Sequence, residues 1–252
     1  MTLIIGIKCK DGAVLASDGA VTGTITQQSK KLSIIKRSAV IGSSGPVGLS
    51  QRFAGTLDLY CKNEQYFAKA PFHVMSEIAD IMRYHILQEA RVADQLKSML
   101  GDVNRMWMAS IMIALPLQNG VSLFSFDYTG APCEATVSLP YVSIGSGTYL
   151  AEPFLSFIRP LIWTECPPDL GVGILSAVWS LGHAIKTSPG GVSLPIQVVI
   201  LRREGGTFEA RELTESELDE PRQAIEDIEK RIAKTATEIS THFPIPPAPP
   251  DT

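Results

Sequence analysis

Short apolar runs separated by turn residues open the chain. The run 3–7 is rich in isoleucine, and the run 13–16 follows it after a Lys-Asp-Gly turn signal. Two such runs around a turn predict a β-hairpin. Ser17-Asp18-Gly19 ends the second strand of that hairpin and should therefore lie beside the start of the first. Two further segments, 31–35 and 39–42, predict two more strands and so a four-stranded N-terminal sheet.

The spacing of apolar residues then changes to that of helices. A first helix is expected over 50–63 and a longer one over 71–100. The longer one carries an apolar stripe at three- and four-residue intervals, as one face of a helix requires. The stripe consists of Met75, Ile78, Met82 and Ile86. These two helices separate the opening strands from a second group of strands.

Strands and helices continue in blocks through the rest of the chain. Strands are expected over 106–115, 121–126, 141–144, 196–202 and 207–213, and helices over 153–162 and 171–185. A doubly wound parallel sheet requires strict alternation of strand and helix, so this order of blocks excludes it. Two sheets face to face, each covered by two helices, accommodate it. The predicted fold class is therefore α+β, a four-layer α-β-β-α sandwich.

The C-terminal part adds a further helix to this sandwich. The segment 214–217 reads Thr-Glu-Ser-Glu, a capping box, and isoleucines then mark one face of a charged helix. These are Ile225, Ile228, Ile232 and Ile239. Their face packs either on its own domain or on a neighbouring subunit. We predict a domain over 1–213, a helical extension over 214–243 and an extended, proline-rich tail over 244–252.

Composition excludes several classes of function. The 252 residues are 45% apolar and 19% charged, as in globular proteins, and their net charge of −4 offers no basic footprint for nucleic acid. No apolar run approaches the roughly 20 residues that span a bilayer, and no secretory signal opens the chain. We therefore expect a cytoplasmic protein without a membrane partner. Cysteines and histidines are scattered without metal-ligand spacing, so neither a metal nor a cofactor is expected.

Thr2 is the first residue with candidate chemistry. A small residue behind the initiator methionine lets that methionine be removed, which leaves a hydroxyl and a free α-amine on one residue. The amine has a pKa of roughly 8, close to working pH, so it can accept the proton of the hydroxyl. Pairing a threonine with an N-terminal amine is one way to activate the hydroxyl as a nucleophile. Taken alone the signal is weak, because many proteins begin with Met-Thr.

Further motifs follow Thr2 in the order found in one family. Asp18 comes after the second strand, Lys30-Lys31 precedes the third, and Gly45 lies in a turn of small residues. Ser146 lies in a Gly-Ser-Gly segment. With these residues the chain resembles a proteasome-type β-subunit of the N-terminal-nucleophile hydrolase superfamily. The resemblance implies the same four-layer sandwich and selects Lys31 as the better match of the two lysines.

Each of these residues has a physical role in the chemistry that the resemblance implies. A cationic Lys31 beside the α-amine of Thr2 disfavours a second positive charge, so the amine stays neutral. Asp18 would hold and orient Lys31. The N–H of Gly45 would stabilise the negative oxygen of a tetrahedral intermediate, and Ser146 would form a hydrogen bond with the amine.

The resemblance also implies a pocket for the residue before the cleaved bond. Val21, Ser43 and Val47 would line it. Because these side chains are small and apolar, they predict a preference for an apolar substrate side chain.

One segment departs from the family pattern. Lys186 stands where the family often has an aspartate, and Pro189 stands where it has a serine or threonine. Either another group supports the serine of the Gly-Ser-Gly segment, or the activity is weak or restricted.

The resemblance therefore implies a self-compartmentalising threonine peptidase that hydrolyses peptides or unfolded proteins. Its partners would be like subunits in a homo-oligomeric ring, fed by an ATPase unfoldase or activator. It is similar to bacterial proteasome homologues and to the peptidase subunit of a two-component ATP-dependent protease. Two alternatives stay open: a proteolytically silent scaffold subunit of such a ring, and an amidase acting on a small molecule.

Overall fold

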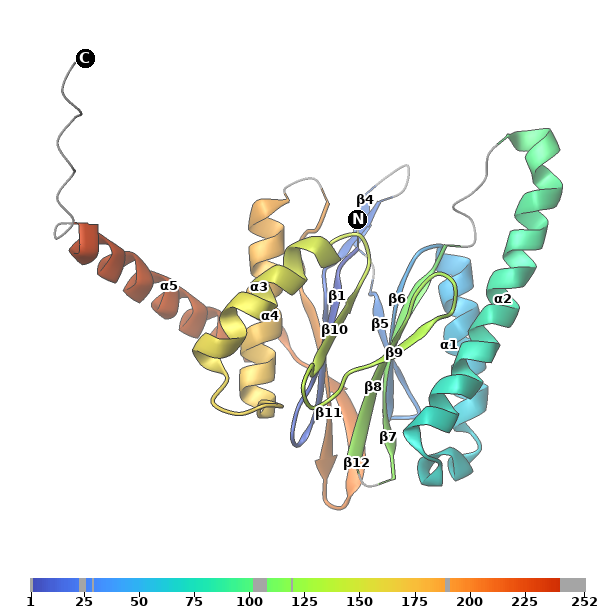
Figure 1. Ribbon diagram of the computed structural model, residues 1–252, viewed down its shortest axis with the longest axis horizontal. Helices are drawn as coiled ribbons and strands as arrows, with labels where there is room; N and C mark the ends of the chain where they lie inside the picture. The colour runs from blue at the N-terminus through green and yellow to red at the C-terminus, as the bar shows by residue number, and fades with distance from the viewer. Residues whose placement is uncertain are drawn as a thin grey trace, which may run out of the picture. The chain divides into compact units, whose positions relative to one another are not determined.

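Two compact units, 1–213 and 214–252, make up the chain. The computed structural model describes residues 2–22, 26–28, 30–101, 108–118, 120–188 and 191–240. The first unit has the predicted α+β architecture, in which two antiparallel sheets lie face to face between two layers of helices (Figure 1).

The first sheet has the strand order β10-β1-β2-β11-β12, with antiparallel neighbours throughout. Its strands are β1 (Ile4–Lys8), β2 (Gly12–Ser17), β10 (Tyr141–Ile144), β11 (Gln197–Glu204) and β12 (Thr207–Glu212). The predicted opening hairpin is confirmed, since β1 and β2 pair with Ile4 opposite Ser17. The start of β1 therefore lies next to the end of β2.

The second sheet has the order β5-β6-β7-β8-β9 and is also antiparallel. Its strands are β5 (Leu32–Ile35), β6 (Ala39–Ser44), β7 (Ser110–Leu117), β8 (Gly120–Phe126) and β9 (Pro132–Glu134). The predicted four-stranded N-terminal sheet is therefore wrong. The four apolar runs are strands, but they form two hairpins in different sheets: β1 and β2 also pair with β10 and β11, and β6 of the second hairpin also pairs with β7.

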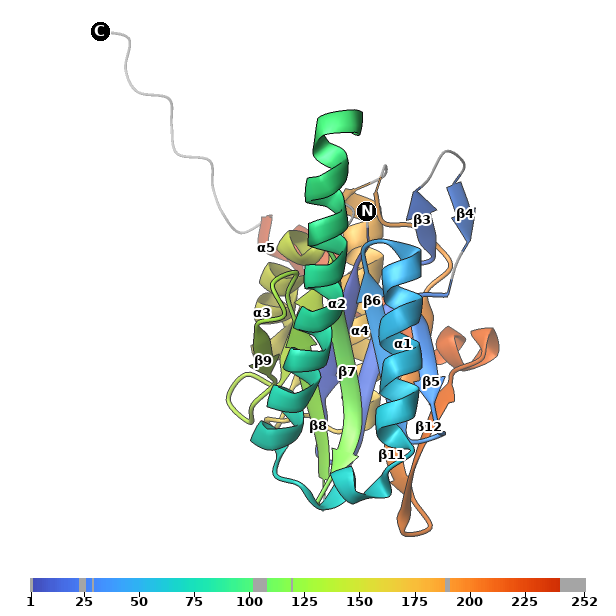
Figure 2. The same ribbon diagram turned by 90° about the vertical axis from the view of Figure 1, so that its right-hand side faces the viewer.

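A separate two-stranded ribbon lies along the chain between these two pairs of strands. It consists of β3 (Ala20–Thr22) and β4 (Thr26–Gln28). The ribbon projects at the end of the sandwich where the N-terminus lies (Figure 2).

Two long helices cover the outer face of each sheet. On the second sheet lie α1 (Val47–Cys61) and α2 (Pro71–Leu100), and on the first lie α3 (Thr148–Ile162) and α4 (Leu170–Thr187) (Figure 1). A short 3-10 helix, η1 (Glu64–Ala68), connects α1 to α2. Three residues of the predicted apolar stripe of α2, Ile78, Met82 and Ile86, are buried in a cluster with Ile111 and Phe124 of the sheet, and the fourth, Met75, is partly buried against it.

A second apolar cluster fills the space between the two sheets. Ile4 and Leu15 of the first sheet meet Val40, Met112 and Leu123 of the second, and all five are buried. Full burial of one such side chain stabilises the fold by about 1.5–3 kcal/mol. The cluster holds the two sheets against each other, and the candidate site forms at one end of it.

Several element boundaries differ from the prediction, most of all the starts of α1, α3 and β7. Helix α3 begins at Thr148, so Pro153 and Pro160 lie inside it. Proline favours the first turn of a helix, which is why the sequence suggested a start at residue 153. Strand β7 begins at Ser110, and residues 102–107 lie outside the described part of the chain.

The second unit contains the 3-10 helix η2 (Glu215–Leu218) and the helix α5 (Asp219–Ser240). The predicted capping box is confirmed, because Thr214 Oγ1 accepts the N–H of Glu217 at 3.3 Å and Glu217 Oε2 accepts the N–H of Thr214 at 2.9 Å. On the isoleucine face, Ile225 is buried and Ile232 is 53% exposed. The predicted tail, 244–252, lies outside the described residues. Among the residues that the structure describes, none of the helices has the length and apolar content that crossing a bilayer demands.

Candidate active site

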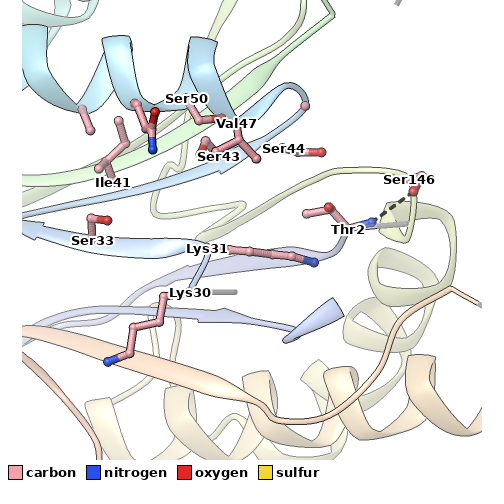
Figure 3. A pocket seen from close by; sticks show the side chains of 13 residues that line it. Thr2, Lys30, Lys31, Ser33, Ile41, Ser43, Ser44, Val47, Ser50 and Ser146 are labelled. Carbon is pink, nitrogen blue, oxygen red and sulfur yellow. Dashed lines mark hydrogen bonds between the residues drawn. The ribbon is translucent and has the colours of Figure 1, made fainter. Parts of the chain in front are cut away.

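Thr2 lies two residues before the start of β1, where the Gly-Ser-Gly segment holds its backbone. The carbonyl of Thr2 accepts the N–H of Gly147 at 3.0 Å, and its nitrogen donates to Ser146 Oγ at 3.3 Å (Figure 3). Gly145 has a φ of 96°, and a Cβ at this position would overlap the carbonyl of Thr2. The segment therefore needs glycine in order to approach Thr2 this closely.

Asp18 connects the end of β2 to the residue after Thr2. Its N–H donates to the carbonyl of Leu3 at 3.2 Å, and its Oδ1 accepts the N–H of Leu3 at 2.8 Å. The side chain of Asp18 is fully buried. A buried carboxylate is stable only when it is hydrogen-bonded and paired with a positive charge.

Lys31 supplies that charge. Its Nζ lies 2.6 Å from Asp18 Oδ1, and its side chain is only 6% exposed. The side chain extends toward Thr2 (Figure 3). Burial lowers the pKa of Lys31, while the hydrogen bond to Asp18 and the carboxylate charge oppose this shift. The pair thus places a carboxylate-bound ammonium beside the first residue of the site.

The neighbouring residue, Lys30, faces away from Thr2 (Figure 3). Its Nζ lies 2.8 Å from Glu212 Oε2, and the two side chains are 72% and 37% exposed. Of the two lysines, the structure therefore brings Lys31 to Asp18.

Gly45 lines the same pocket as Thr2, directly after β6. Its φ of 127° is one that residues with a side chain rarely adopt. A Cβ at Gly45 would also come within 2.5 Å of the carbonyl oxygen of Met108 and 2.8 Å of Ala109 Cα. Only glycine therefore fits this backbone, which lines the pocket that also contains Thr2.

A pocket of ≈ 500 Å³ opens beside Thr2. Ser43 of β6 and Val47 of α1 line it, at the positions expected for substrate binding. The third expected residue, Val21, belongs to β3, and its side chain lies outside the described part of the structure. The volume lies within the range of ordinary small-molecule and side-chain pockets.

The pocket has a mixed lining that the sequence did not reveal. Ser33, Ser50 and Gln51 line it together with the apolar Ala54. Ser50 lies three residues after Val47, and Ala54 lies four residues after Ser50, which is the spacing of one helix face. Starting the predicted helix at Val47 would have identified them. The predicted apolar pocket rested on Val21, Ser43 and Val47 alone, so it did not include these polar residues.

Lys186, at the position where the family often has an aspartate, lies in the last turn of α4 with an exposed side chain. A cation is favoured at this end of a helix because it faces the negative end of the helix dipole. Pro189 lies outside the described residues.

The groups around Thr2 suit proton transfer. Thr2 and Lys31 line the same pocket, the ammonium of Lys31 contacts the buried carboxylate of Asp18, and the hydroxyl of Ser146 contacts the Thr2 nitrogen. Within the described ranges, no three histidine, cysteine, aspartate or glutamate side chains cluster as a metal site requires.

Comparisons with known proteins agree with this architecture. No curated protein sequence matches the chain. Among solved structures, "Anbu (ancestral beta-subunit)" from Yersinia bercovieri is similar with a TM-score of 0.69 and 17% identity, over 98% of this chain and 100% of that chain. The "Helical Assembly of the Anbu Complex" from Pseudomonas aeruginosa has a TM-score of 0.67 and 18% identity, over 99% and 100% of the two chains. At these identities the likeness shows a shared fold. The family described as "Proteasome subunit" matches residues 2–156, more than half of the sequence, and the chain belongs to that family.

Proposed function

We propose that this protein is a threonine peptidase that uses Thr2 as its nucleophile after Met1 is removed. The observation that carries the proposal is the buried pair of Lys31 and Asp18 beside Thr2, at the mouth of a pocket of ≈ 500 Å³. A buried ion pair next to a cleft is typical of functional sites, because desolvation adjusts the proton affinity of nearby groups.

The reaction begins when the Thr2 hydroxyl oxygen attacks the carbonyl carbon of the scissile peptide bond. The hydroxyl proton passes to the α-amine of Thr2, which stays neutral because the ammonium of Lys31 disfavours a second positive charge. The carbonyl oxygen becomes negative, and the N–H of Gly45 stabilises it. Ser146 holds the amine in position, as its contact with the Thr2 nitrogen at 3.3 Å suggests.

The intermediate then collapses to an acyl ester. The α-amine, now protonated, gives its proton to the departing amine of the peptide, the C–N bond breaks, and the Thr2 oxygen keeps the acyl group. A water molecule attacks this ester, with the same amine accepting the water proton. The ester C–O bond then breaks, the ammonium gives this proton to the departing Thr2 oxygen, and the carboxylic acid product leaves Thr2 with its hydroxyl and its neutral amine restored.

We further propose that the protein assembles with copies of itself. One similar solved structure is described as a helical assembly, and the likeness covers 99% of this chain. Enclosing the sites within an assembly would restrict hydrolysis to peptides and unfolded chains. Light scattering at several protein concentrations tests this, and a mass equal to 27.3 kDa per particle throughout would contradict it.

The catalytic proposal is tested by Thr2→Ala in a chain prepared with residue 2 at its N-terminus. Losing the hydroxyl should abolish peptide hydrolysis and labelling by an epoxyketone or β-lactone, because no nucleophile remains. Thr207→Ala is the matched control, since Thr207 lies at the exposed start of β12. If Thr2→Ala and Thr207→Ala hydrolyse peptides equally, Thr2 is not the nucleophile and the silent scaffold subunit becomes the better interpretation.

A further inference from the structure

The backbone of Lys31 is held by a residue of the other sheet. Among the described strands, β5 lies at the edge of its sheet, so one side of its backbone has no strand beside it there. Unpaired backbone groups at a buried edge are costly and need another partner. Gln197, the first residue of β11 in the opposite sheet, supplies that partner where β5 begins.

The Gln197 side-chain amide binds this edge as a neighbouring strand would. Its Oε1 accepts the N–H groups of Lys31 at 3.2 Å and Leu32 at 3.1 Å. Its Nε2 donates to the carbonyl of Leu32 at 3.1 Å. From the other side, the carbonyl of Lys31 accepts the N–H of Ser43 at 3.3 Å. The main chain of Lys31 is therefore fixed between the two sheets.

The same strand also sets the position of Asp18. Gln197 lies directly opposite Ser17 in the pairing of β11 with β2, and Ser17 immediately precedes Asp18. One residue thus aligns the strand that carries the carboxylate and binds the segment that carries the ammonium. The 2.6 Å contact between Lys31 and Asp18 depends on both alignments.

We propose that Gln197 is a positioning residue, which sets the ammonium of Lys31 at its working distance from the Thr2 amine. The proposal rests on the proposed function, because it assigns Lys31 the task of keeping that amine neutral. The side chain at position 197 must both accept and donate hydrogen bonds, and it must be long enough to reach the backbone of Lys31 and Leu32. Asparagine is one methylene shorter, and the carboxylate of glutamate has no proton to donate to the Leu32 carbonyl.

Gln197→Met tests this role, since methionine is also unbranched and removes all three hydrogen bonds. Displacing Lys31 lets the Thr2 amine hold its proton more firmly, so the acid limb of the rate profile should move up by about one pH unit. We expect kcat to fall about 10- to 100-fold with little change in KM, because a positioning defect acts on the chemical step. Gln95→Met, an exposed site on α2, is the matched control and should leave both unchanged.

A purely structural role would lower the amount of folded enzyme without moving the acid limb. A folded Gln197→Met enzyme with the acid limb of the wild type would therefore overturn the proposal. The pKa of the Thr2 amine, followed by NMR of threonine-labelled protein, gives the same test without peptide hydrolysis. It should rise in Gln197→Met and stay constant in Gln95→Met, and equal values in both would overturn the proposal.

Hydrogen exchange in the wild-type protein separates the two proposals and needs no variant to fold. The amides of Lys31 and Leu32 should exchange as slowly as those bonded within the β5–β6 pair. Free exchange at both amides overturns the positioning role even if Thr2 proves to be the nucleophile. Slow exchange of both amides in the wild type and a raised pKa of the Thr2 amine in Gln197→Met would support the positioning role. If Thr2→Ala nevertheless kept full hydrolysis, the positioning role would stand and the proposed peptidase mechanism would be contradicted.

Discussion

The two walls of the pocket are built in different ways. On the wall formed by Thr2, Lys31 and Ser146, hydrogen bonds hold the backbone of Thr2, and the fully buried carboxylate of Asp18 holds the ammonium of Lys31. On the wall formed by α1, side chains such as Val47, which is 56% exposed, project from a helix surface. The first wall can stabilise a transition state because it does not have to reorganise. The second can vary with little cost to the fold, so it is suited to substrate selection.

The largest loss of stability is expected when the fixed wall loses its buried carboxylate, in Asp18→Asn. Asparagine keeps the acceptor for the Leu3 N–H but leaves the Lys31 ammonium buried without a counter-charge. We expect the free energy of unfolding to fall by about 3–5 kcal/mol, measured by urea denaturation. Glu212→Gln makes the same chemical change at the adjacent, exposed pair with Lys30, and should cost less than about 1 kcal/mol.

A double variant separates stability from chemistry in this pair. Adding Lys31→Met to Asp18→Asn removes the unpaired charge, so most of the lost stability should return. Hydrolysis should not return, because the ammonium is absent. Full recovery of hydrolysis in the double variant would mean that the ion pair is structural only.

An intermediate effect is expected at Gly45, where the fixed wall meets β6. In Gly45→Ala the φ of 127° and the contact with the Met108 carbonyl make any Cβ unfavourable, so we expect a loss of about 1–3 kcal/mol. Displacing its N–H should also lower kcat by about 100-fold. Gly48→Ala is the matched control on α1, where a Cβ meets nothing within 4 Å. It should be neutral or stabilise the protein by up to about 1 kcal/mol, since alanine favours helices.

The smallest effect on stability is expected for Val47→Ser, on the wall formed by α1. The side chain is exposed, so the free energy of unfolding should change by less than about 0.5 kcal/mol. The ratio of kcat/KM for a peptide with leucine before the cleaved bond to one with serine there should fall by about tenfold. An unchanged ratio would place the selecting residues elsewhere in the pocket.

The parts of the site that local sequence dictates were predictable. Asp18 follows a strand that returns directly beside Thr2, so a hairpin alone places the two together. The partners of β5 and β6 were not predictable, because an apolar run identifies a strand but not the strand it pairs with. Gln197 was missed for the same reason: it contacts Lys31 across 166 residues, and a single glutamine within an apolar run carries no local signal. The polar pocket lining depended on the true start of α1, and helix ends are the least certain part of such predictions.

One oxygen atom, Asp18 Oδ1, receives both the Leu3 N–H from the first sheet and the Lys31 ammonium that arrives with the second. If Thr2 acts as proposed, reactivity and completed folding are consequently a single event. A chain whose two sheets have not yet come together would lack the cation beside Thr2, and with it the means of keeping the amine neutral.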